Sequence, residues 1–299
     1  MTDGWQERNW RAFYETAWSE RANYISDLID SGESSITRCI NLLRVREKYY
    51  RMKSDLDGSG ASWRKVKSEE EIDPIDKRNI FTQKPFMGKY ILLPYYTRPS
   101  HMEFVLDYWN HKGPFDAVVE LGSGFGLRIF ELFYAGIPAS IPLFGGELTD
   151  SGVSISRKLA ALDPRINATF FSFDHLSPDL HPVKEKKFDN LLMFTCHSLE
   201  QVHKIPRAFF RELANCAPNV TVIHMEPFGF QISAETKTAL DHKKFIEDRK
   251  WNVNFSEAVK QAVADGTCSV ETAIMDAFLP TDDINSTSLL VWKNIPSNS

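Results

Sequence analysis

A glycine-rich turn within residues 118–128, VVELGSGFGLR, is the part of the sequence best suited to binding a ligand. Gly122, Gly124 and Gly126 alternate with other residues between an apolar run and a helical one. Glycine lets the backbone adopt unusual dihedral angles and approach a ligand closely. A dinucleotide fold carries a G-x-G-x-x-G turn, but Leu127 stands at the place of its last glycine. The turn therefore indicates a nucleotide-like ligand and disfavours a nicotinamide-dependent oxidoreductase.

Histidine and glutamate residues follow two later apolar runs. If His197 begins a helix, Glu200 and His203 follow at steps of three and share one broad face. An imidazole or a carboxylate can remove a proton from a hydroxyl or amine. We expect His197 to act as a base with Glu200 as its positioning carboxylate. His224 and Glu226, after the next run, are second candidates for the same chemistry.

Metal ligation is the alternative use of four of these side chains, those of His197, Glu200, His203 and Glu226. Their His-x-x-Glu-x-x-His spacing differs from the His-Glu-x-x-His pattern of helix-borne zinc sites, so we expect no metal. The cysteines are widely and unevenly spaced, which fits neither a zinc pair nor a disulfide framework. We expect four buried, reduced thiols, at Cys39, Cys196, Cys216 and Cys268.

Short β-rich runs alternate with helical stretches in the second half of the chain, which is typical of parallel α/β sheets. The predicted strands are 117–121, 141–147, 168–174, 190–194 and 220–226. The predicted helices are 101–111, 127–134, 154–162, 205–216 and a region over about 235–266. Two β-like runs, 269–279 and 288–294, suit a closing antiparallel pair.

The first part of the chain has a different pattern. Aromatic and aliphatic residues at helical spacing predict two or three helices within residues 5–53, with a break at 30–32 and a cap at Ser34 or Ser35. Residues 55–73 are polar and read as a loop or junction, whereas 86–99 suit an extended segment. We therefore predict an N-terminal helical region and linker over 1–80 and a second domain over 81–299.

The Glu-x-Gly-x-Gly-x-Gly pattern beginning at Glu120 resembles the first motif of class I S-adenosylmethionine-dependent methyltransferases. In that family an acidic residue closing the next strand binds the ribose hydroxyls, and another after the third strand contacts the adenine amino group. Glu147 and Asp174 stand at the matching places. The resemblance covers about residues 115–294. It implies an α/β, Rossmann-like, doubly wound seven-stranded sheet, mostly parallel with an antiparallel C-terminal strand and an N-terminal helical extension.

The resemblance also implies a cofactor, S-adenosyl-L-methionine, and a product, S-adenosyl-L-homocysteine. An aromatic-rich run before the first strand stands where many members of this fold cover the cofactor. Its side chains could contact the methionine carboxylate or the acceptor, because arginine pairs with carboxylates and aromatic faces attract sulfonium cations. The alternative is a packed segment that joins the N-terminal helices to the sheet. The predicted cofactor-binding residues are Glu120, Gly122, Ser123, Gly124, Glu147, Leu148, Asp174, His175, Thr195, Arg98 and Tyr96.

The methyl acceptor is less well defined. The Cys-His-Ser-Leu-Glu-Gln stretch and the Glu-Pro-Phe-Gly turn resemble bacterial sugar or natural-product O-methyltransferases. We expect transfer to an oxygen, or to a nitrogen, of a small polar acceptor. The alternatives are an N-methyltransferase of an amino acid, amine or peptide, and a binding or scaffold module without catalysis. The Asn/Asp-Pro-Pro-Tyr type motif of nucleic-acid methyltransferases is absent after the fourth predicted strand, which speaks against DNA bases.

Composition fits a folded globular protein. Of 299 residues, 42% are hydrophobic and 25% charged, which argues against disorder and against coiled coils. The net charge of −5 and the lack of a basic run argue against nucleic acid as a partner. The sequence shows neither a secretion signal nor an apolar run of about 18 residues, so we expect a cytoplasmic protein that does not bind membranes. The oligomeric state stays open.

Overall fold

The computed structural model describes residues 3–54, 61–65, 82–86, 89–93, 101–235, 237–278 and 286–295. The chain divides into two compact units, Met1–Ser100 and His101–Ser299. The junction that we predicted near residue 80 falls between described segments, so a division at that residue stays a prediction.

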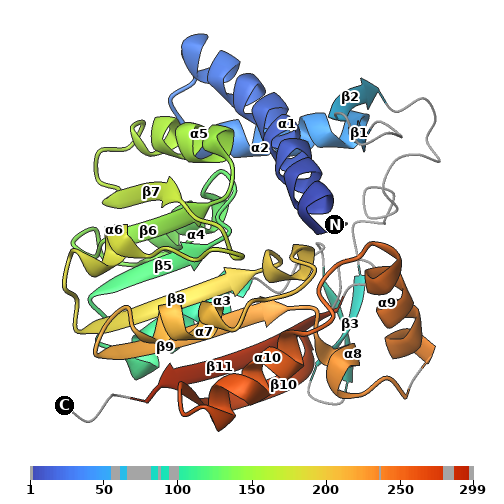
Figure 1. The fold of residues 1–299 in the computed structure, drawn as a ribbon. Coiled ribbons are helices and arrows are strands. Elements are labelled where there is room, and N and C mark those ends of the chain that lie inside the picture. The colour runs from blue at the N-terminus through green and yellow to red at the C-terminus, as the bar shows by residue number, and fades with distance from the viewer. Residues whose placement is uncertain are drawn as a thin grey trace. The chain divides into compact units, whose positions relative to one another are not determined.

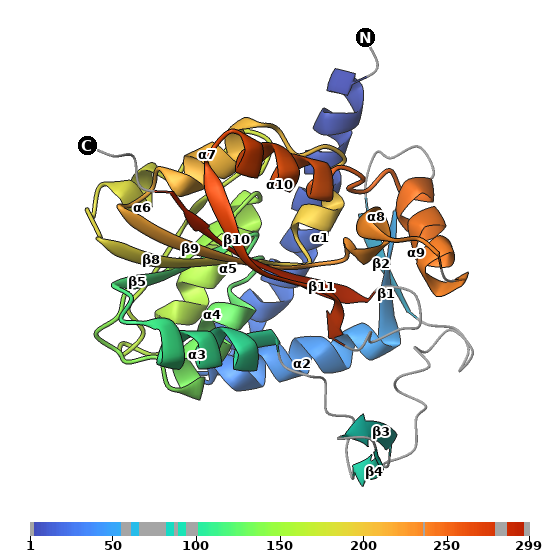
Figure 2. The ribbon, with the colours of Figure 1, turned by 90° about the horizontal axis from the view of Figure 1, so that it is seen from below.

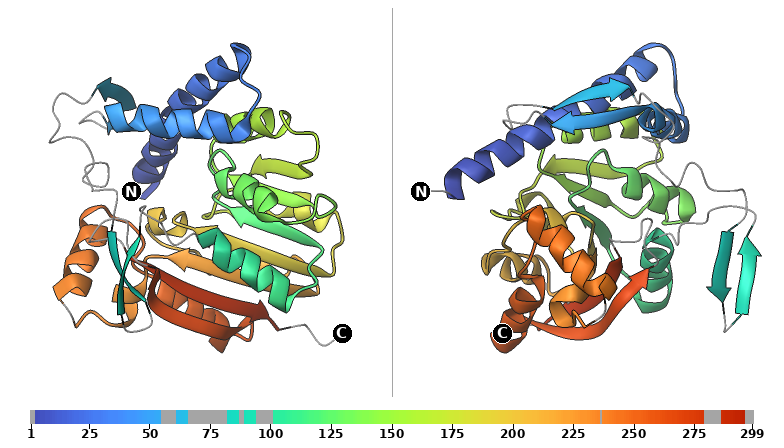
Figure 3. Two further views of the ribbon diagram at one scale, coloured as in Figure 1. Left: turned by 180° about the vertical axis from the view of Figure 1, so that it is seen from behind. Right: turned by 90° about the vertical axis from the view of Figure 1, so that its right-hand side faces the viewer.

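The first unit begins with a pair of helices, as predicted. Gly32, with φ of +100°, ends the first helix, and the Ser35 hydroxyl accepts a hydrogen bond from Arg38 N at 3.2 Å to cap the second. The first helix packs against the second and against β2 (Figure 3). The elements are α1 (Asp3–Asp30), α2 (Ile36–Tyr49) and the antiparallel strands β1 (Tyr50–Ser54) and β2 (Ala61–Lys65).

The predicted loop over 55–73 is wrong at β2. Trp63 in this strand lies 5.7 Å from the guanidinium groups of both Arg21 and Arg46. Such cation–π contacts favour an ordered strand in a segment whose composition suggests a loop. A second antiparallel pair, β3 (Thr82–Phe86) and β4 (Lys89–Leu93), agrees in part with the extended segment predicted over 86–99 (Figure 3, right).

The second unit is built on a seven-stranded sheet in the order β10-β11-β9-β8-β5-β6-β7. Strand β11 is antiparallel to both of its neighbours, and the other pairs are parallel, which the arrows in Figure 1 show for β8, β9 and β11. The predicted fold class is confirmed. The strands are β5 (Ala117–Leu121), β6 (Leu143–Glu147), β7 (Ala168–Ser172), β8 (Asn190–Cys196), β9 (Asn219–Glu226), β10 (Cys268–Phe278) and β11 (Thr287–Asn294).

Helices cover both faces of this sheet: α3 and α4 lie on one face, and α6, α7 and α10 lie on the other (Figure 2). The helices are α3 (His101–Lys112), α4 (Leu127–Ala135), α5 (Asp150–Ala160), α6 (His181–Lys184), α7 (Ala208–Ala214), α8 (Gly229–Ile232), α9 (Lys237–Asp248) and α10 (Phe255–Ala264). The predicted start of a helix at residue 154 is wrong. The Thr149 hydroxyl accepts from Gly152 N at 3.2 Å and caps α5 four residues earlier.

The sheet is buried between these helices. Trp292, Phe130, Phe144, Phe170 and Phe194 are among the largest fully buried side chains, and burying one such ring contributes roughly 3 kcal/mol. The four cysteines are buried free thiols, as predicted. Among the described residues, every helix is too short or too polar to cross a lipid bilayer.

Candidate functional site

The site lies where the strand order reverses, between β5 and β8. In open α/β sheets, ligands bind at such a reversal, outside the carboxyl ends of the strands. The turn after β5 and the loop after β8 meet there, because the Ser198 hydroxyl donates to Leu121 O at 2.9 Å. The predicted ligand-binding turn and the predicted catalytic loop therefore share one edge of the sheet.

The glycine turn is tied to the neighbouring strand by its backbone. The amides of Gly122 and Ser123 both donate to Gly146 O, at 2.7 Å and 2.9 Å. Gly122 has a φ of +83°, which favours glycine. A Cβ atom at this position would lie 2.3 Å from Ser198 Cβ and 3.2 Å from His175 Nε2. Glycine is needed here because the loops that carry Ser198 and His175 lie within contact distance of the turn.

Glu147 fastens the turn to helix α5. One carboxylate oxygen accepts from Gly124 N at 2.8 Å. The other accepts from the amide and the hydroxyl of Thr149, at 3.0 Å and 2.8 Å. Burial raises the pKa of Glu147, and these donors oppose the rise. The residue predicted to bind ribose therefore also shapes the loop that would carry the ligand.

Several buried polar atoms at this edge have no hydrogen-bond partner among the described residues. They are Glu120 Oε2, Ser123 Oγ and both ring nitrogens of His175. Burial lowers the pKa of His175 to about 3, so the ring is neutral at pH 7 and has one donor and one acceptor nitrogen. Buried polar groups in folded proteins are nearly always hydrogen-bonded, directly or through water. These atoms are therefore candidates for contact with a polar ligand.

Glu120 should make the stability of the protein pH-dependent. Burial raises its pKa to about 7, against the opposing effect of Arg128, which lies 3.3 Å away. The folded state then holds a proton more tightly than the unfolded chain, so this contribution is full below about pH 4.5 and is lost as the pH rises to 7. We expect Glu120→Gln to raise the melting temperature more, relative to wild type, at pH 7.5 than at pH 5. Thermal scans measure this at both pH values. A melting-temperature difference between variant and wild type that is the same at pH 5 and pH 7.5 would contradict the prediction.

Two other predicted contacts border the same edge. Asp174, half-buried, follows β7 and accepts from Leu176 N at 2.8 Å, which orders the turn after the strand. Leu148 is half-buried directly after Glu147. The predicted contacts Tyr96 and Arg98 lie outside the described residues, so their roles stay predictions.

His197 and Glu200 form a hydrogen-bonded pair. His197 Nδ1 lies 3.2 Å from Glu200 Oε2, and the side chains are 24% and 6% exposed. Burial alone lowers the pKa of His197, but the hydrogen bond and charge of Glu200 raise it above its ordinary value. The two residues that we predicted as base and positioning carboxylate are thus in direct contact, with the imidazole partly open to solvent.

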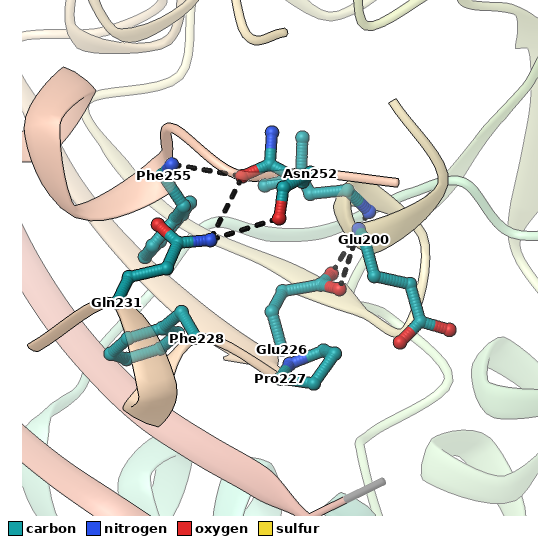
Figure 4. Close-up of a pocket in the computed structure, with 8 residues that line it drawn as sticks. Glu200, Glu226, Pro227, Phe228, Gln231, Asn252 and Phe255 are labelled. Atoms are coloured by element: carbon teal, nitrogen blue, oxygen red, sulfur yellow. Dashed lines mark hydrogen bonds between the residues drawn. The ribbon is translucent and has the colours of Figure 1, made fainter. Parts of the chain in front are cut away.

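The loop that carries this pair is held by Glu226. Its carboxylate accepts from the backbone amides of Ser198, Leu199 and Glu200, at 3.1 to 3.3 Å. A small pocket beside Glu226 has an empty volume of about 170 Å³, part of which is open to solvent. Figure 4 shows Glu226 turned toward the loop and the Glu200 carboxylate turned away from it. Glu226 therefore positions the loop, although we predicted it as an alternative base.

Removing this carboxylate should loosen the loop. In Glu226→Gln, one oxygen becomes an NH₂ group that faces backbone donors, and at least one buried amide loses its acceptor. We expect a loss of about 1–3 kcal/mol in the free energy of unfolding, measured by chemical denaturation. The control, Glu185→Gln on the surface, should change it by less than about 0.5 kcal/mol. Equal stability of the two variants would contradict the role given to Glu226.

His224 is not at the site, contrary to prediction. The ring is completely buried, 6.0 Å from the ring of Phe210 and 5.2 Å from that of Phe255. Its Nε2 accepts from Trp292 Nε1 at 2.9 Å, so Nδ1 carries the proton and donates to Thr195 Oγ1 at 2.9 Å. Both ring nitrogens are used inside the core, and an acceptor cannot reach them. Thr195 is completely buried as well, so its predicted contact with a cofactor stays a prediction.

Comparisons with known proteins identify similar folds at low sequence identity. No family model and no curated protein matches the chain. Among solved structures, magnesium protoporphyrin IX methyltransferase from Synechocystis PCC 6803 aligns with 16% identity and a TM-score of 0.45, over 65% of this chain and 82% of that one. Geranyl diphosphate C-methyltransferase from Streptomyces coelicolor A3(2) aligns with 14% identity and a TM-score of 0.44, over 65% of this chain and 79% of that one. An O-methyltransferase from Bacillus cereus aligns with 13% identity and a TM-score of 0.44, over 66% of this chain and 81% of that one.

The sheet itself identifies the fold, independently of these similarities. It has seven strands, the last one antiparallel between two others, and an E-x-G-x-G-x-G turn at the reversal of strand order. The fold is that of the class I methyltransferases. In this methyltransferase fold the three-glycine turn follows β5, and the acidic residue Glu147 ends β6.

Sequence reasoning missed two residues of the site and misplaced a third. Thr287, at the start of β11, and His101, at the start of α3, lie next to His197, because Thr287 Oγ1 is 2.6 Å from His197 Nε2 and 3.3 Å from His101 Nε2. Their distance along the chain left no local signal. His203 was expected to share a helix face with His197, but the helix is a three-residue turn, Leu199–Gln201, and exposed His203 bonds instead to Lys250 O.

The structure also bears on metal binding. Among the described residues, no cluster of three or more histidine, cysteine, aspartate or glutamate side chains could hold a metal ion.

Proposed function

We propose that this chain binds S-adenosylmethionine and transfers its methyl group to an oxygen or nitrogen of a small polar acceptor. The observation that carries the proposal is the glycine turn at the reversal of strand order, together with the nearby polar atoms that lack partners among the described residues, on Glu120, Ser123 and His175. Glycine at 122 lets the backbone approach a ligand, and the buried polar atoms offer hydrogen bonds to it.

Charge at this edge supports a cationic ligand. Glu120, Glu147, Glu200 and Glu226 are all buried there. The charge of Glu147 contributes to the raised pKa of Glu120, and that of Glu200 to the raised pKa of Glu226, so these carboxylates repel one another. A sulfonium cation would relieve this repulsion, whereas a pyrophosphate would add to it. The charge therefore favours S-adenosylmethionine over a nicotinamide dinucleotide.

The residues that would hold the cofactor follow from the same edge. Glu147 accepts from Gly124 N and from the amide and hydroxyl of Thr149, and a backbone hydrogen bond from Leu148 adds to these. A ribose hydroxyl would share the carboxylate with these donors or replace one of them. Asp174 would accept from the adenine amino group. The rest of the proposed contacts are Glu120, Gly122, Ser123, Gly124, Leu148, His175, Thr195, Tyr96 and Arg98.

The proposed chemistry is an in-line displacement. Bound S-adenosylmethionine would supply the electrophilic methyl group. His197 would take the proton that the acceptor loses, and Glu200, 3.2 Å from Nδ1, would stabilise the imidazolium that forms. Glu226 would keep both in place through the loop backbone. A sugar or natural-product intermediate suits this partly exposed base, and we expect nucleic acid to be no substrate.

Calorimetric titration with S-adenosylhomocysteine tests the proposal, with NADH as the comparison ligand. Saturable binding of S-adenosylhomocysteine alone is the expected result, and it would justify screening sugars, amines and hydroxylated metabolites as acceptors. Binding of NADH alone would overturn the proposal. Binding of S-adenosylhomocysteine without methyl transfer to any acceptor class would favour a scaffold module with the same fold.

A further inference from the structure

Three distant segments meet at one hydroxyl group. Thr287 Oγ1 lies 2.6 Å from Nε2 of His197 and 3.3 Å from Nε2 of His101. The two imidazole rings are edge to face, with centroids 5.7 Å apart. The ring of Phe278 packs 4.6 Å from that of His101, and Phe278 pairs with Thr287 across the two strands. The arrangement is therefore fixed by β10, β11, α3 and the loop after β8.

The hydrogen-bond partners of His197 determine which of its ring nitrogens carries a proton. An ionised Glu200 only accepts, so His197 Nδ1 carries a proton and neutral His197 has its lone pair on Nε2. That lone pair accepts the Thr287 hydroxyl proton. The Thr287 oxygen can then accept from His101 Nε2. In the protonated state of His197, the direction reverses: Nε2 donates to Thr287, and Thr287 donates to His101.

We propose that Thr287 and His101 form a proton relay with His197, in which Thr287 is a positioning residue for the base. The relay rests on the proposed methyl transfer, because that reaction releases one proton per turnover. Both ring nitrogens of His197 are already bonded, Nδ1 to Glu200 and Nε2 to Thr287. An acceptor proton therefore reaches His197 through the Thr287 oxygen.

The proton steps balance. The acceptor takes the place of His101 in the 3.3 Å hydrogen bond to Thr287. It gives its proton to Thr287 Oγ1 as the Thr287 hydroxyl proton moves to His197 Nε2. After methyl transfer, His101 returns as the tautomer with its proton on Nδ1, so its Nε2 has a lone pair. Nε2 of His197 then gives its proton to Thr287 as the Thr287 hydroxyl proton moves to His101 Nε2, and His101 loses its Nδ1 proton. His101 is half-buried, so it can pass the proton to water. His197 is then neutral and ready for another cycle.

Nearby carboxylates stabilise the protonated form of His197 during the transfer. Glu200 and Glu226 raise its pKa, whereas Arg128 lowers it. Among the described residues, His101 also faces it, from α3. His197 also has a φ of +52°, unusual for a residue other than glycine. The backbone hydrogen bond from His197 N to Met225 O, 3.1 Å, helps to hold this conformation and aims the ring at Thr287.

The test is NMR titration of the histidine rings in the full-length protein without cofactor. In the wild type we expect a change in the ring tautomer of His101 as His197 titrates. Thr287→Val keeps the shape but removes the hydroxyl, so this coupling should disappear and the pKa of His197 should fall by about one, because its charged form loses an acceptor. Thr287→Ser keeps the hydroxyl and should retain the coupling.

Independent titration of the two rings in the wild type would overturn the relay, as would unchanged coupling in Thr287→Val. If Thr287→Val does not fold, His101→Phe, which keeps the aromatic contact with Phe278, gives the second measurement: the pKa of His197 should change in it. An unchanged pKa there would also overturn the relay. These readings need no methyl transfer, so a failed titration with S-adenosylhomocysteine would remove the proposed function but would leave the coupling measurable.

Discussion

Replacing Gly122 with alanine is expected to weaken binding of S-adenosylhomocysteine at least 100-fold. The new Cβ would lie 2.3 Å from Ser198 Cβ and 2.7 Å from its hydroxyl oxygen. Ser198 cannot move aside easily, because its hydroxyl bonds to Leu121 O and its amide to Glu226. The turn would have to shift, and the backbone would no longer approach the ligand. Calorimetry on the folded variant measures the loss.

Gly266→Ala is the matched control. Gly266 has a φ of +71°, close to the +83° of Gly122, but a Cβ there meets nothing within 4 Å among the described residues. This variant should lose about 1 kcal/mol of stability from backbone strain and keep wild-type affinity. Wild-type affinity in Gly122→Ala as well would mean that the ligand binds elsewhere.

Replacing His197 with asparagine should reduce methyl transfer by roughly 10²–10⁴-fold, with affinity for S-adenosylhomocysteine within about twofold of wild type. Asparagine tolerates the positive φ at this position, so the loop keeps its conformation. The measurement is acceptor-dependent formation of S-adenosylhomocysteine, once an acceptor is found. His203→Asn, an exposed neighbour on the same loop, is the control and should retain full activity.

The pH dependence gives a second reading of the same variant. Glu200 raises the pKa of His197, so the neutral, basic form predominates only above the ordinary histidine value. Turnover by the wild type should therefore rise with pH through the raised pKa and fall below it. In His197→Asn this rise of turnover with pH should be absent. A variant with wild-type turnover and an unchanged pH profile would show that the base lies elsewhere.

Much of the fold could be predicted because its signals are local. The apolar strands and the glycine turn each lie within about ten residues, and strands β5 and β9 agree with prediction to within one residue. The early start of α5 was missed because the hydrophobic pattern begins later than its Thr149 cap. Strand β2 was missed because its order depends on Trp63 packing with distant arginines.

The candidate site was predictable in part for the same reason. His197 and Glu200 are three residues apart, so the sequence could pair them. His224 and Glu226 looked equivalent to them, but alternation along a strand cannot show that the partners of His224 are Thr195 and Trp292 in the core. Thr287 comes from a strand far along the chain, and tertiary structure alone brings it to His197.

A crystal structure of the protein with S-adenosylhomocysteine tests the central claim most directly. We predict that the ligand lies along the turn at Gly122–Gly124, with its ribose hydroxyls on Glu147 and a hydrogen bond to at least one of the buried atoms that now lack partners among the described residues, Ser123 Oγ and the His175 nitrogens. Its sulfur should face the loop that carries His197. Density for the ligand at another edge of the sheet, with this turn unchanged, would contradict the proposed site and the chemistry built on it.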